Sequence, residues 1–390
     1  MTNQSGDLAT TKTGDLSNPL AERTAPDTDE VAQCGAGELR SGIAPSVVRA
    51  PYLQRVSDSA GRVLWTSEPG EPEQIRILQS QDSSTQLARV GETAAVDGAQ
   101  PDGGALQYDV SVDQLAPDTI YCYQLFAGDQ PATDPAGFRT APQPGVGAKV
   151  SFIALGDSGS GDADQEAIFA QMETVPFRLM IHTGDIAYDN GTMVDFEKKF
   201  FAIYASLLKS FPAFPSVGNH DEGVIFHQVY DLPWAGPNNW YSFDYGDVHF
   251  VALDTNNIDA EQVAWLEADL TANQRAWTVV YGHHPAFSSG EHGSTAAVQK
   301  EFVPIFERHH VDLVLSGHDH DYERMVPQNG VNYVVTGGGG RGTRAVGSSS
   351  FTAFSEQVEH FVYVEVQGEK LLLHAIDADG TEFDQLAINH

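Results

Sequence analysis

Hydrophobic and polar residues follow two different patterns along this chain, and the pattern changes near residue 149. Between Val47 and Thr140, short runs alternate between apolar and polar residues, and turn residues such as EPGEPE and GDQPATDP interrupt them. Alternation of this kind predicts short β-strands over 62–67, 74–80, 106–112, 119–127 and 136–140. Roughly seven short strands in about 95 residues are typical of a small β-sandwich.

From Lys149 onward, continuous apolar runs end in polar residues and alternate with helical patterns. The apolar runs are 150–157, 177–185, 247–254, 276–284 and 311–320. A helical period predicts helices over 260–273 and 297–310. This alternation is typical of α/β layers, in which functional residues lie at the carboxyl ends of the strands. Further predicted strands, which we expect to complete a second sheet of the same domain, are 360–367, 370–377 and 382–388.

These patterns divide the chain into three predicted parts. Residues 1–43 are rich in Thr, Asp, Ser, Gly and Ala and are predicted to be a flexible segment. Residues 44–142 form the predicted β-sandwich, and residues 143–390 form the predicted α/β domain. The segment 141–148, APQPGVGA, links the two, because its Pro and Gly residues interrupt regular elements.

The chain carries 21 basic and 54 acidic residues, which gives a formal net charge of −33. A surface with this charge repels nucleic acid and anionic membranes. We therefore expect no nucleic-acid or membrane partner, and a small substrate rather than a polyanion. Bound cations could reverse the potential inside one cleft. The simpler explanation of the acidity is adaptation to a salty or harsh medium.

Cys34 and Cys122 are the two cysteines, too few for a disulfide framework or a cysteine-based zinc site. One bridge between them remains possible, although Cys122 alternates with Tyr121 and Tyr123 in a predicted strand and is expected to face outward. No apolar stretch approaches the ~18–20 residues needed to span a bilayer. The first 30 residues contain no basic-then-apolar leader. The sequence thus leaves open a cytoplasmic protein or one that has lost a leader.

Potential metal ligands follow the predicted strands in the second half of the chain. Glycine precedes several of them and lets the backbone turn sharply and approach an ion closely. Carboxylate, amide and imidazole groups together suit two hard or borderline cations lying roughly 3.5–4 Å apart. Asp185 is central enough in this order to bridge two ions. The candidates are Asp157, Asp185, Tyr188, Asn219, His283, His318 and His320.

The motifs around these residues resemble those of the calcineurin-like metallophosphoesterases, and among them the purple acid phosphatases. The matching motifs within residues 150–325 are GDSG, GDIAYDNG, GNHDEG, GHHPAFSSGEHG and GHDHDYER. Residues 45–142, with PYLQ, RVLWTS and QYDVSVDQLAPDTIYCYQ, resemble the fibronectin type III-like domain of plant-type and many bacterial members. The resemblance implies a four-layer α/β fold with two mixed sheets flanked by helices, preceded by a small all-β sandwich.

The same resemblance implies a dinuclear centre that holds a ferric ion and a divalent iron, zinc or manganese ion. The ligands of the ferric ion would be Asp157, Asp185, Tyr188 and His320. The ligands of the divalent ion would be Asp185, Asn219, His283 and His318. Tyr188 indicates the purple subfamily, because a tyrosinate on ferric iron gives the charge-transfer colour.

Residues beside the ligands are candidates for proton transfer. His220 resembles the family's outer-sphere histidine, which binds phosphate or protonates the leaving group. His292 resembles a substrate-binding position of the animal-type enzymes, and the neighbouring Glu291 is a possible proton donor. We expect His284 to line the rim and His182 to be a core residue.

The glycine-rich run 337–342 lacks the strand and helix context of a P-loop. We expect it to form a flexible loop beside the cleft. Arg341 or Arg324 is then a possible phosphate contact.

We predict an acid phosphatase that hydrolyses phosphate monoesters by attack of a metal-bound hydroxide on phosphorus. A trivalent ion lowers the pKa of bound water further than a divalent ion, so hydroxide is available even in acid. His220, or the pair Glu291 and His292, would act as general acid. A phosphodiesterase of the same fold is one alternative, and a non-catalytic binding or adhesion protein is another. The family and the sandwich domain favour an extracytoplasmic protein, either secreted or periplasmic.

Overall fold

The computed structural model describes residue 34 and residues 47–67, 74–79, 86–87, 106–128, 130–221, 223–234 and 236–390. Apart from Cys34, the predicted flexible segment 1–43 lies outside the described residues. Among the helices in the described part, none is both long enough and apolar enough to cross a membrane.

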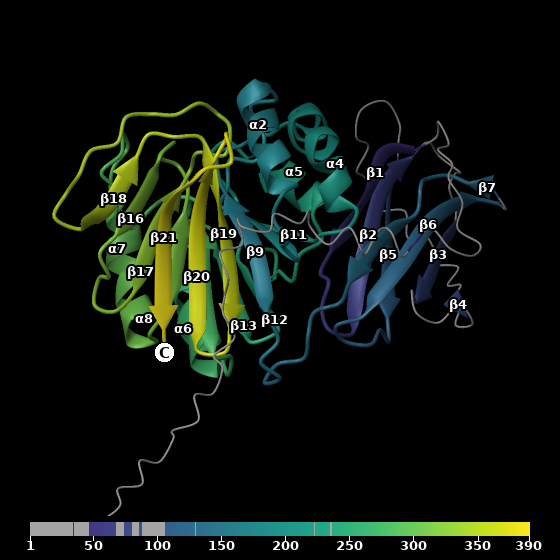
Figure 1. Ribbon diagram of the computed structural model, residues 1–390, viewed down its shortest axis with the longest axis horizontal. Coiled ribbons are helices and arrows are strands. Elements are labelled where there is room, and N and C mark those ends of the chain that lie inside the picture. The colour runs from purple at the N-terminus through teal and green to yellow at the C-terminus, as the bar shows by residue number, and fades with distance from the viewer. Residues whose placement is uncertain are drawn as a thin grey trace, which may run out of the picture.

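The N-terminal part of the described chain forms two small antiparallel sheets (Figure 1). One sheet contains β1 (Val47–Gln54), β2 (Ala60–Ser67) and β5 (Leu106–Asp113). The other contains β4 (Gln86–Leu87), β3 (Gln74–Gln79), β6 (Ile120–Ala127), β7 (Gln130–Pro131) and β8 (Ala136–Arg139). Apolar side chains of both sheets form one core, with Leu53, Trp65, Val110 and Tyr123 among them. The predicted strand-rich N-terminal region is present. The boundaries at 44 and 142 and the fibronectin-like identity stay predictions.

Cys34 and Cys122 form a disulfide bond. Both residues are buried and pack with Phe126 in a small apolar cluster. The expectation that Cys122 faces outward is wrong. The bonded Cys34 covers Cys122, and both residues are buried.

Two larger mixed sheets make up the second part of the molecule (Figure 1). The first contains, in spatial order, β11 (Ala213–Pro215), β10 (Leu179–His182), β9 (Val150–Leu155), β19 (His360–Gln367), β20 (Lys370–Asp377) and β21 (Glu382–Asn389). The second contains β12 (Tyr241–Tyr245), β13 (Val248–Leu253), β14 (Trp277–Gly282), β15 (Leu313–Ser316), β17 (Asn332–Thr336), β16 (Tyr322–Met325) and β18 (Thr352–Glu356). Strands β9 to β11 run parallel, as do β13, β14, β15 and β17.

The two large sheets share a hydrophobic core. The Phe152 ring of β9 meets Phe250 of β13 edge-on, with the ring centroids 5.2 Å apart. Phe214 of β11 stacks on Phe243 of β12 at 3.8 Å. The late strands 360–367, 370–377 and 382–389 extend the sheet that begins with β9 to β11. The predicted mixed α/β architecture is therefore confirmed.

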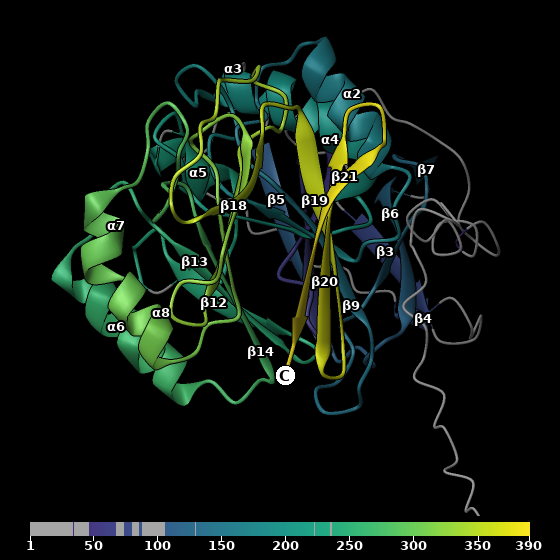
Figure 2. The ribbon, with the colours of Figure 1, turned by 60° about the vertical axis from the view of Figure 1, so that its left-hand side comes forward.

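Helices lie beside both sheets (Figure 2). Helices α6 (Ala260–Ala272), α7 (Ala296–Glu301) and α8 (Val303–Arg308) pack on β13, β14 and β15 through a second apolar core that includes Leu266, Val280, Phe306 and Val314. The remaining described helices are α2 (Ala163–Met172), α3 (Met193–Phe196), the π-helical turn η2 (Glu197–Phe201), α4 (Ala202–Leu208) and α5 (Gly223–Val229).

The predicted helix over 297–310 is wrong in one respect, because the chain forms two short helices that break at Phe302. Pro304 lies in the first turn of α8. Proline has no N–H to donate and its ring collides with the carbonyl four residues earlier, so one continuous helix is unfavourable here. The first turn of a new helix tolerates proline.

The N-terminal sheets contact the larger part through buried polar groups. Arg49 of β1 is 2% exposed, and its guanidinium binds the carboxylate of Glu197 in η2. The Tyr52 hydroxyl donates to the carbonyl of Val229 at 2.6 Å, and the Tyr123 hydroxyl donates to that of Lys209 at 2.7 Å.

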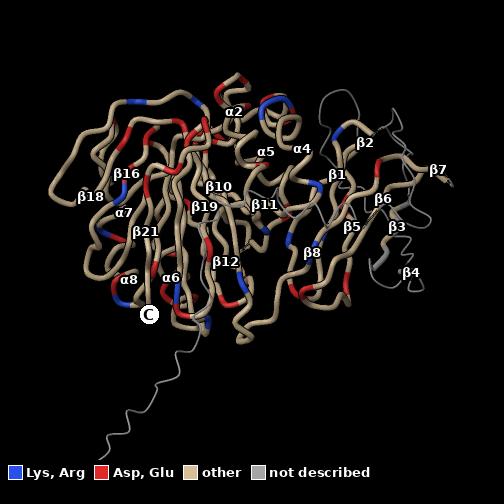
Figure 3. Tube along the Cα trace, in the orientation of Figure 1, with Lys and Arg blue, Asp and Glu red and all other residues tan. Residues whose placement is uncertain are grey.

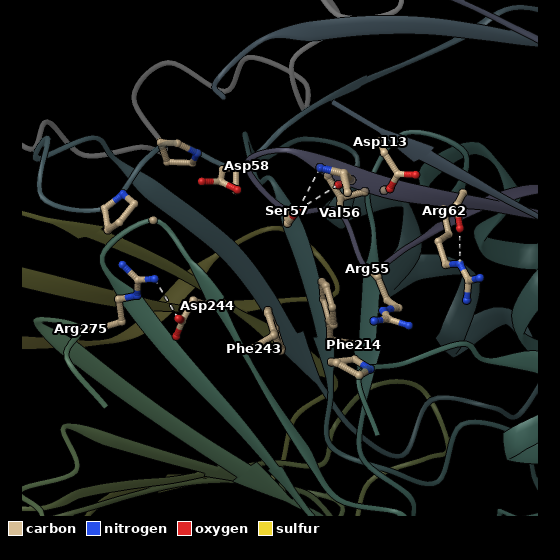
Figure 4. Close-up of a pocket in the computed structure, with 18 residues that line it drawn as sticks. Arg55, Val56, Ser57, Asp58, Arg62, Asp113, Phe214, Phe243, Asp244 and Arg275 are labelled. Atoms are coloured by element: carbon tan, nitrogen blue, oxygen red, sulfur yellow. Dashed lines mark hydrogen bonds and ion pairs between the residues drawn. The ribbon is translucent and has the colours of Figure 1, made fainter. Parts of the chain in front are cut away.

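A cleft of about 490 Å³ also lies at this junction (Figure 4). Its apolar lining includes Phe214 and Phe243, and its arginines, Arg55, Arg62 and Arg275, are paired with aspartates. The balance of charges in this cleft therefore gives no indication of a particular ligand.

One histidine of the second sheet is expected to make stability depend on pH. His249 of β13 lies with Nδ1 2.7 Å from Asp244 and Nε2 2.8 Å from Asp269. Burial alone would lower the pKa of His249, but the hydrogen bonds and charges of the two aspartates outweigh burial and raise it to about 9. Arg275 also pairs with Asp244.

Since the folded pKa of His249 exceeds its unfolded value of about 6.5, its contribution is complete below pH ~6.5 and disappears as pH rises to ~9. We expect the wild-type chain to lose about 2–3 kcal/mol more stability than His249→Gln over this range. Urea midpoints of both chains at several pH values would measure the difference. Equal losses in the two chains would contradict the prediction.

Candidate metal centre

The predicted ligands lie where strands of the two large sheets end. Asp157 follows β9, Asp185 follows β10 and Asn219 follows β11, all in the first sheet. His283 follows β14 and His318 follows β15 in the second sheet. These strands run parallel within each sheet, so their carboxyl ends lie at one edge of it. The predicted ligands of both sheets lie at such edges.

Asp157, Asp185 and His283 form the centre of this site. One ligand atom from each lies within 4.8 Å of the others, and all three side chains are buried. Asp185 Oδ2 lies 3.4 Å from His283 Nε2. Asp185 therefore lies within this central group, and its bridging of two ions stays a prediction.

The other four predicted ligands lie on two sides of this centre. On one side, the Tyr188 hydroxyl donates to Asp157 Oδ1 at 2.8 Å and lies 3.2 Å from His320 Nε2. On the other side, His283 Nε2 lies 2.9 Å from Asn219 Oδ1 and 3.2 Å from His318 Nδ1. The predicted ligands therefore form two sets, with Asp185 beside His283. One set is Asp157, Tyr188 and His320. The other set is Asn219, His283 and His318.

The donor set fits two cations. Asp157 is fully buried and Asp185 is 2% exposed, and a buried carboxylate requires a compensating positive charge. Burial alone would lower the pKa of His283, but the charges of Asp185 and Asp157 raise it to about 9. The centre thus attracts positive charge. Carboxylate, phenolate, amide and imidazole groups in one place are the ligands of first-row metal ions.

Neighbouring backbone groups orient the imidazole ligands. His283 Nδ1 lies 3.0 Å from the Thr183 carbonyl, so this nitrogen carries the proton and Nε2 faces the centre. His320 Nδ1 likewise donates to the Gly342 carbonyl at 2.9 Å, which leaves its Nε2 toward Tyr188 and Asp157. A hydrogen bond at the far nitrogen fixes the tautomer that a metal ligand needs.

The backbone around the ligands is held in uncommon conformations. Asp157, Asp185 and His318 have φ angles of 58°, 56° and 72°, in a region that L-residues seldom occupy. Strained residues of this kind cluster at functional sites. A Cβ atom on Gly218 would lie 2.1 Å from Asp185 Oδ1, and one on Gly317 would lie 2.4 Å from Asp157 Oδ2. These glycines therefore permit the close approach of the loops that carry the ligands.

Two aspartates that were not among the predicted site residues hold the ligand loops. Asp221 accepts hydrogen bonds from the backbone N–H groups of Ile186, Ala187 and Gly218, so it ties the GDIAY loop to the GNHD loop. Asp319 accepts hydrogen bonds from the backbone N–H groups of His292 and Gly293. Both aspartates lie inside the sequence motifs GNHD and GHDH, so these motifs could have indicated them from the sequence.

The predicted proton-transfer residues lie around the same centre. His220 Nδ1 donates to the Asp189 carbonyl at 2.7 Å, and its ring lies 4.6 Å from the Tyr188 ring. His292 stacks on His318 at 4.3 Å, and its Nε2 accepts a hydrogen bond from Arg344. The Glu291 side chain is 65% exposed and lies 4.0 Å from Arg344.

The remaining candidates divide between the rim and the core. His284 Nδ1 lies 3.0 Å from Thr255 Oγ1, and the His284 ring lies 4.3 Å from that of His318. His182 is fully buried and its Nε2 lies 2.8 Å from Ser158 Oγ. Arg324 forms a two-point ion pair with Asp384, at 2.6 and 2.9 Å, so it is not available to a phosphate.

Comparison with known proteins finds phosphoesterases among similar sequences and similar folds. The family model "Calcineurin-like phosphoesterase" matches residues 150–322. Purple acid phosphatase 3 of Arabidopsis thaliana is 28% identical over 263 residues, which cover 57% of this chain and 72% of the relative. Tartrate-resistant acid phosphatase type 5 of Sus scrofa is 25% identical over 298 residues, which cover 62% and 86%. The structure of purple acid phosphatase PPD1 from yellow lupin (Lupinus luteus) superposes with a TM-score of 0.76 at 20% identity, over 87% of this chain and 74% of that chain.

Proposed function

We propose that this chain, a phosphoric ester hydrolase with a calcineurin-like metallophosphoesterase domain and purple acid phosphatase relatives, acts on small phosphate monoesters. Metal-dependent hydrolysis of phosphoric esters follows from the family and from the cluster of Asp157, Asp185 and His283. The observation that carries the finer proposal is the arrangement of the predicted ligands in two sets around Asp185.

The proposed metal pair is a ferric ion with a divalent iron, zinc or manganese ion. Asp157, Tyr188 and His320 would hold the ferric ion, and Asn219, His283 and His318 would hold the divalent ion, with Asp185 shared. When bound, such ions polarise phosphoryl oxygens and lower the pKa of coordinated water. The proximity of Tyr188 to Asp157 and His320 supports a tyrosinate ligand on the ferric side.

His220 is the proposed general acid. Its Nδ1 is anchored on the Asp189 carbonyl, which leaves Nε2 to donate a proton to the departing oxygen. His292 is less suited to this role, because its Nε2 accepts a hydrogen bond from Arg344, and arginine can only donate. Glu291 has an exposed carboxylate and pairs weakly with the same arginine.

The partners and location remain part of the proposal. The net charge of −33 supports a small substrate and opposes nucleic-acid or membrane partners. The bond between Cys34 and Cys122 supports an oxidising, extracytoplasmic compartment.

Metal analysis with visible absorption spectroscopy tests the proposed centre. We expect about two metals per chain, including iron, and a broad tyrosinate-to-iron band that Tyr188→Phe abolishes. Hydrolysis of 4-nitrophenyl phosphate should exceed that of bis(4-nitrophenyl) phosphate. Two metals without the band, together with faster diester hydrolysis, would replace the proposal with a phosphodiesterase. A chain that binds no metal would refute it.

A further inference from the structure

The predicted metal centre opens into a small polar pocket of about 330 Å³. Its lining comprises Tyr188, Asp189, His220, His320, Arg341, Gly342, Thr343 and Arg344. The floor therefore consists of two predicted ligands and the proposed general acid, and the wall is the segment 341–344. If His220 protonates the leaving group, the leaving group must occupy this pocket. This step rests on the proposed function.

Backbone hydrogen bonds fix the segment 341–344 to the metal centre. The N–H of Arg341 donates to the carbonyl of Asp157 at 3.0 Å. The N–H of Arg344 donates to the carbonyl of His320 at 2.8 Å, and the Gly342 carbonyl accepts from His320 Nδ1. The expectation that the glycine-rich run 337–342 forms a flexible loop does not agree with these hydrogen bonds. The backbone of both arginines is consequently fixed beside the predicted ligands.

The two guanidinium groups contact different residues beside the centre. Arg341 lies 4.9 Å from the centre of the Tyr188 ring, on the side proposed for the ferric ion. Arg344 contacts His292, which stacks on His318, on the side proposed for the divalent ion. A small molecule in the pocket would thus lie near two cationic groups.

Each arginine is held by an exposed carboxylate that another anion could replace. Arg341 lies 2.6 Å from Asp189, whose side chain is 67% exposed, and Arg344 lies 4.0 Å from Glu291, which is 65% exposed. Exposed ion pairs contribute little to stability, because solvent and salt screen both charges. Arginine binds carboxylate and phosphate through paired hydrogen bonds. Exchange of Asp189 or Glu291 for a substrate anion therefore costs little.

Two cationic groups in one pocket are notable in this chain, because 54 acidic residues oppose 21 basic ones and acidic positions are spread over the described chain (Figure 3). Apart from Gly342 and the Tyr188 ring, the residues that line the pocket are polar or charged. A small leaving group that carries its own negative charge matches the lining in size and in charge.

We propose that Arg341 and Arg344 select phosphate esters whose leaving group carries an anionic group, such as a carboxylate or a second phosphate. The scissile phosphate lies between the predicted metal ligands, and the arginines bind the charge on the leaving group. They are specificity-determining residues, separate from the ligands and from His220.

Binding of two matched, non-hydrolysable phosphonates tests this inference without turnover. 2-Carboxyethylphosphonate and propylphosphonate differ only in the carboxylate, and calorimetry on the metal-loaded full chain gives both dissociation constants. A charge-assisted hydrogen bond contributes about 1.5–3 kcal/mol, so we expect roughly a 10- to 100-fold preference for the carboxylate compound. The double variant Arg341→Gln/Arg344→Gln should lose this preference. Arg308→Gln, an exposed arginine paired with Glu267 outside the pocket, should keep it.

If the double variant folds poorly, Thr343→Glu is the second variant, because it places a negative charge in the same pocket. Thr343→Glu should also lose the preference for the carboxylate compound. Equal binding of the two phosphonates by the wild-type chain would overturn the inference, as would a preference that survives in either pocket variant. Failure to hydrolyse both 3-phosphoglycerate and glycerol 3-phosphate would instead count against the proposed function, since the binding comparison does not depend on turnover. Loss of the matching rate preference for 3-phosphoglycerate over glycerol 3-phosphate in the double variant would agree with the binding result.

Discussion

Replacement of Asp185 by asparagine is expected to abolish metal binding at the centre and hydrolysis with it. The Asp185 carboxylate lies 3.4 Å from His283 Nε2 and also accepts the backbone N–H of His220 at 2.8 Å. Asparagine keeps the size of the side chain but removes the negative charge that both cation positions would share. If Asp185 serves both cations as predicted, its loss should reduce activity well beyond the roughly 10- to 100-fold typical of an outer partner of a metal ligand.

The metal-free Asp185→Asn chain should be less stable than the metal-free wild type. Asp185 and His283 are both buried and lie 3.4 Å apart, and loss of the carboxylate leaves the imidazole of raised pKa with less compensating charge. Metal content, initial rates and thermal midpoints with and without metal would separate these effects. Asp109→Asn makes the same chemical change on β5, far along the chain from the centre, and should keep both metal and activity. A variant Asp185→Asn that retained two metals would refute the assignment.

Replacement of Arg49 by methionine is expected to cause the largest loss of stability. The Arg49 side chain is 1% exposed and binds Glu197 and Tyr52, and its guanidinium lies 4.1 Å from the centre of the Phe201 ring. Removal of one partner from a buried ion pair costs about 3–5 kcal/mol, because the other charge is left without compensation. The loss should weaken the junction between the N-terminal sheets and the larger part.

Arg55→Met is the matched control for Arg49→Met. Arg55 lies at the same junction, but its side chain is 44% exposed and lies 3.5 Å from Asp231. An exposed pair of this kind contributes about 0–1 kcal/mol. Urea unfolding followed by tryptophan fluorescence would compare the first transition of each variant. A similar change in both would show that the burial of Arg49 has no special effect.

The sequence identified candidate ligands that the structure brings together, because each depends on a local signal. An apolar run that ends in Gly-Asp, Gly-Asn or Gly-His marks the end of a buried strand, and the ends of parallel strands meet at one edge of a sheet. The residues Asp157, Asp185 and His283 can be grouped in this way from their positions along the chain. The distances between them and the orientation of each imidazole depend on how the two sheets pack, which the local signals do not contain.

Other features depend on contacts between distant segments, which no local pattern records. Asp221 binds backbone N–H groups of a loop 34 and 35 residues earlier, so its role appears only when the two loops meet. Cys122 has the alternation of an outward-facing strand residue, and only the disulfide to Cys34 explains its burial. At 297–310 the apolar period continues through Pro304 and predicts one helix, whereas in the structure the chain forms two helices that break before this proline.

The division of the predicted ligands between two sheets would link cation binding to the order of folding. Asp157, Asp185 and Asn219 are supplied by one sheet, and His283 and His318 by the other. Neither sheet alone contains the donors of a complete site, so cations would bind tightly only after the sheets have docked. Preferential binding to the native state stabilises it by RT ln(1 + [L]/Kd). Cations would therefore stabilise the domain only after its two sheets have docked. Their removal would lower the free-energy barrier to separation of the sheets.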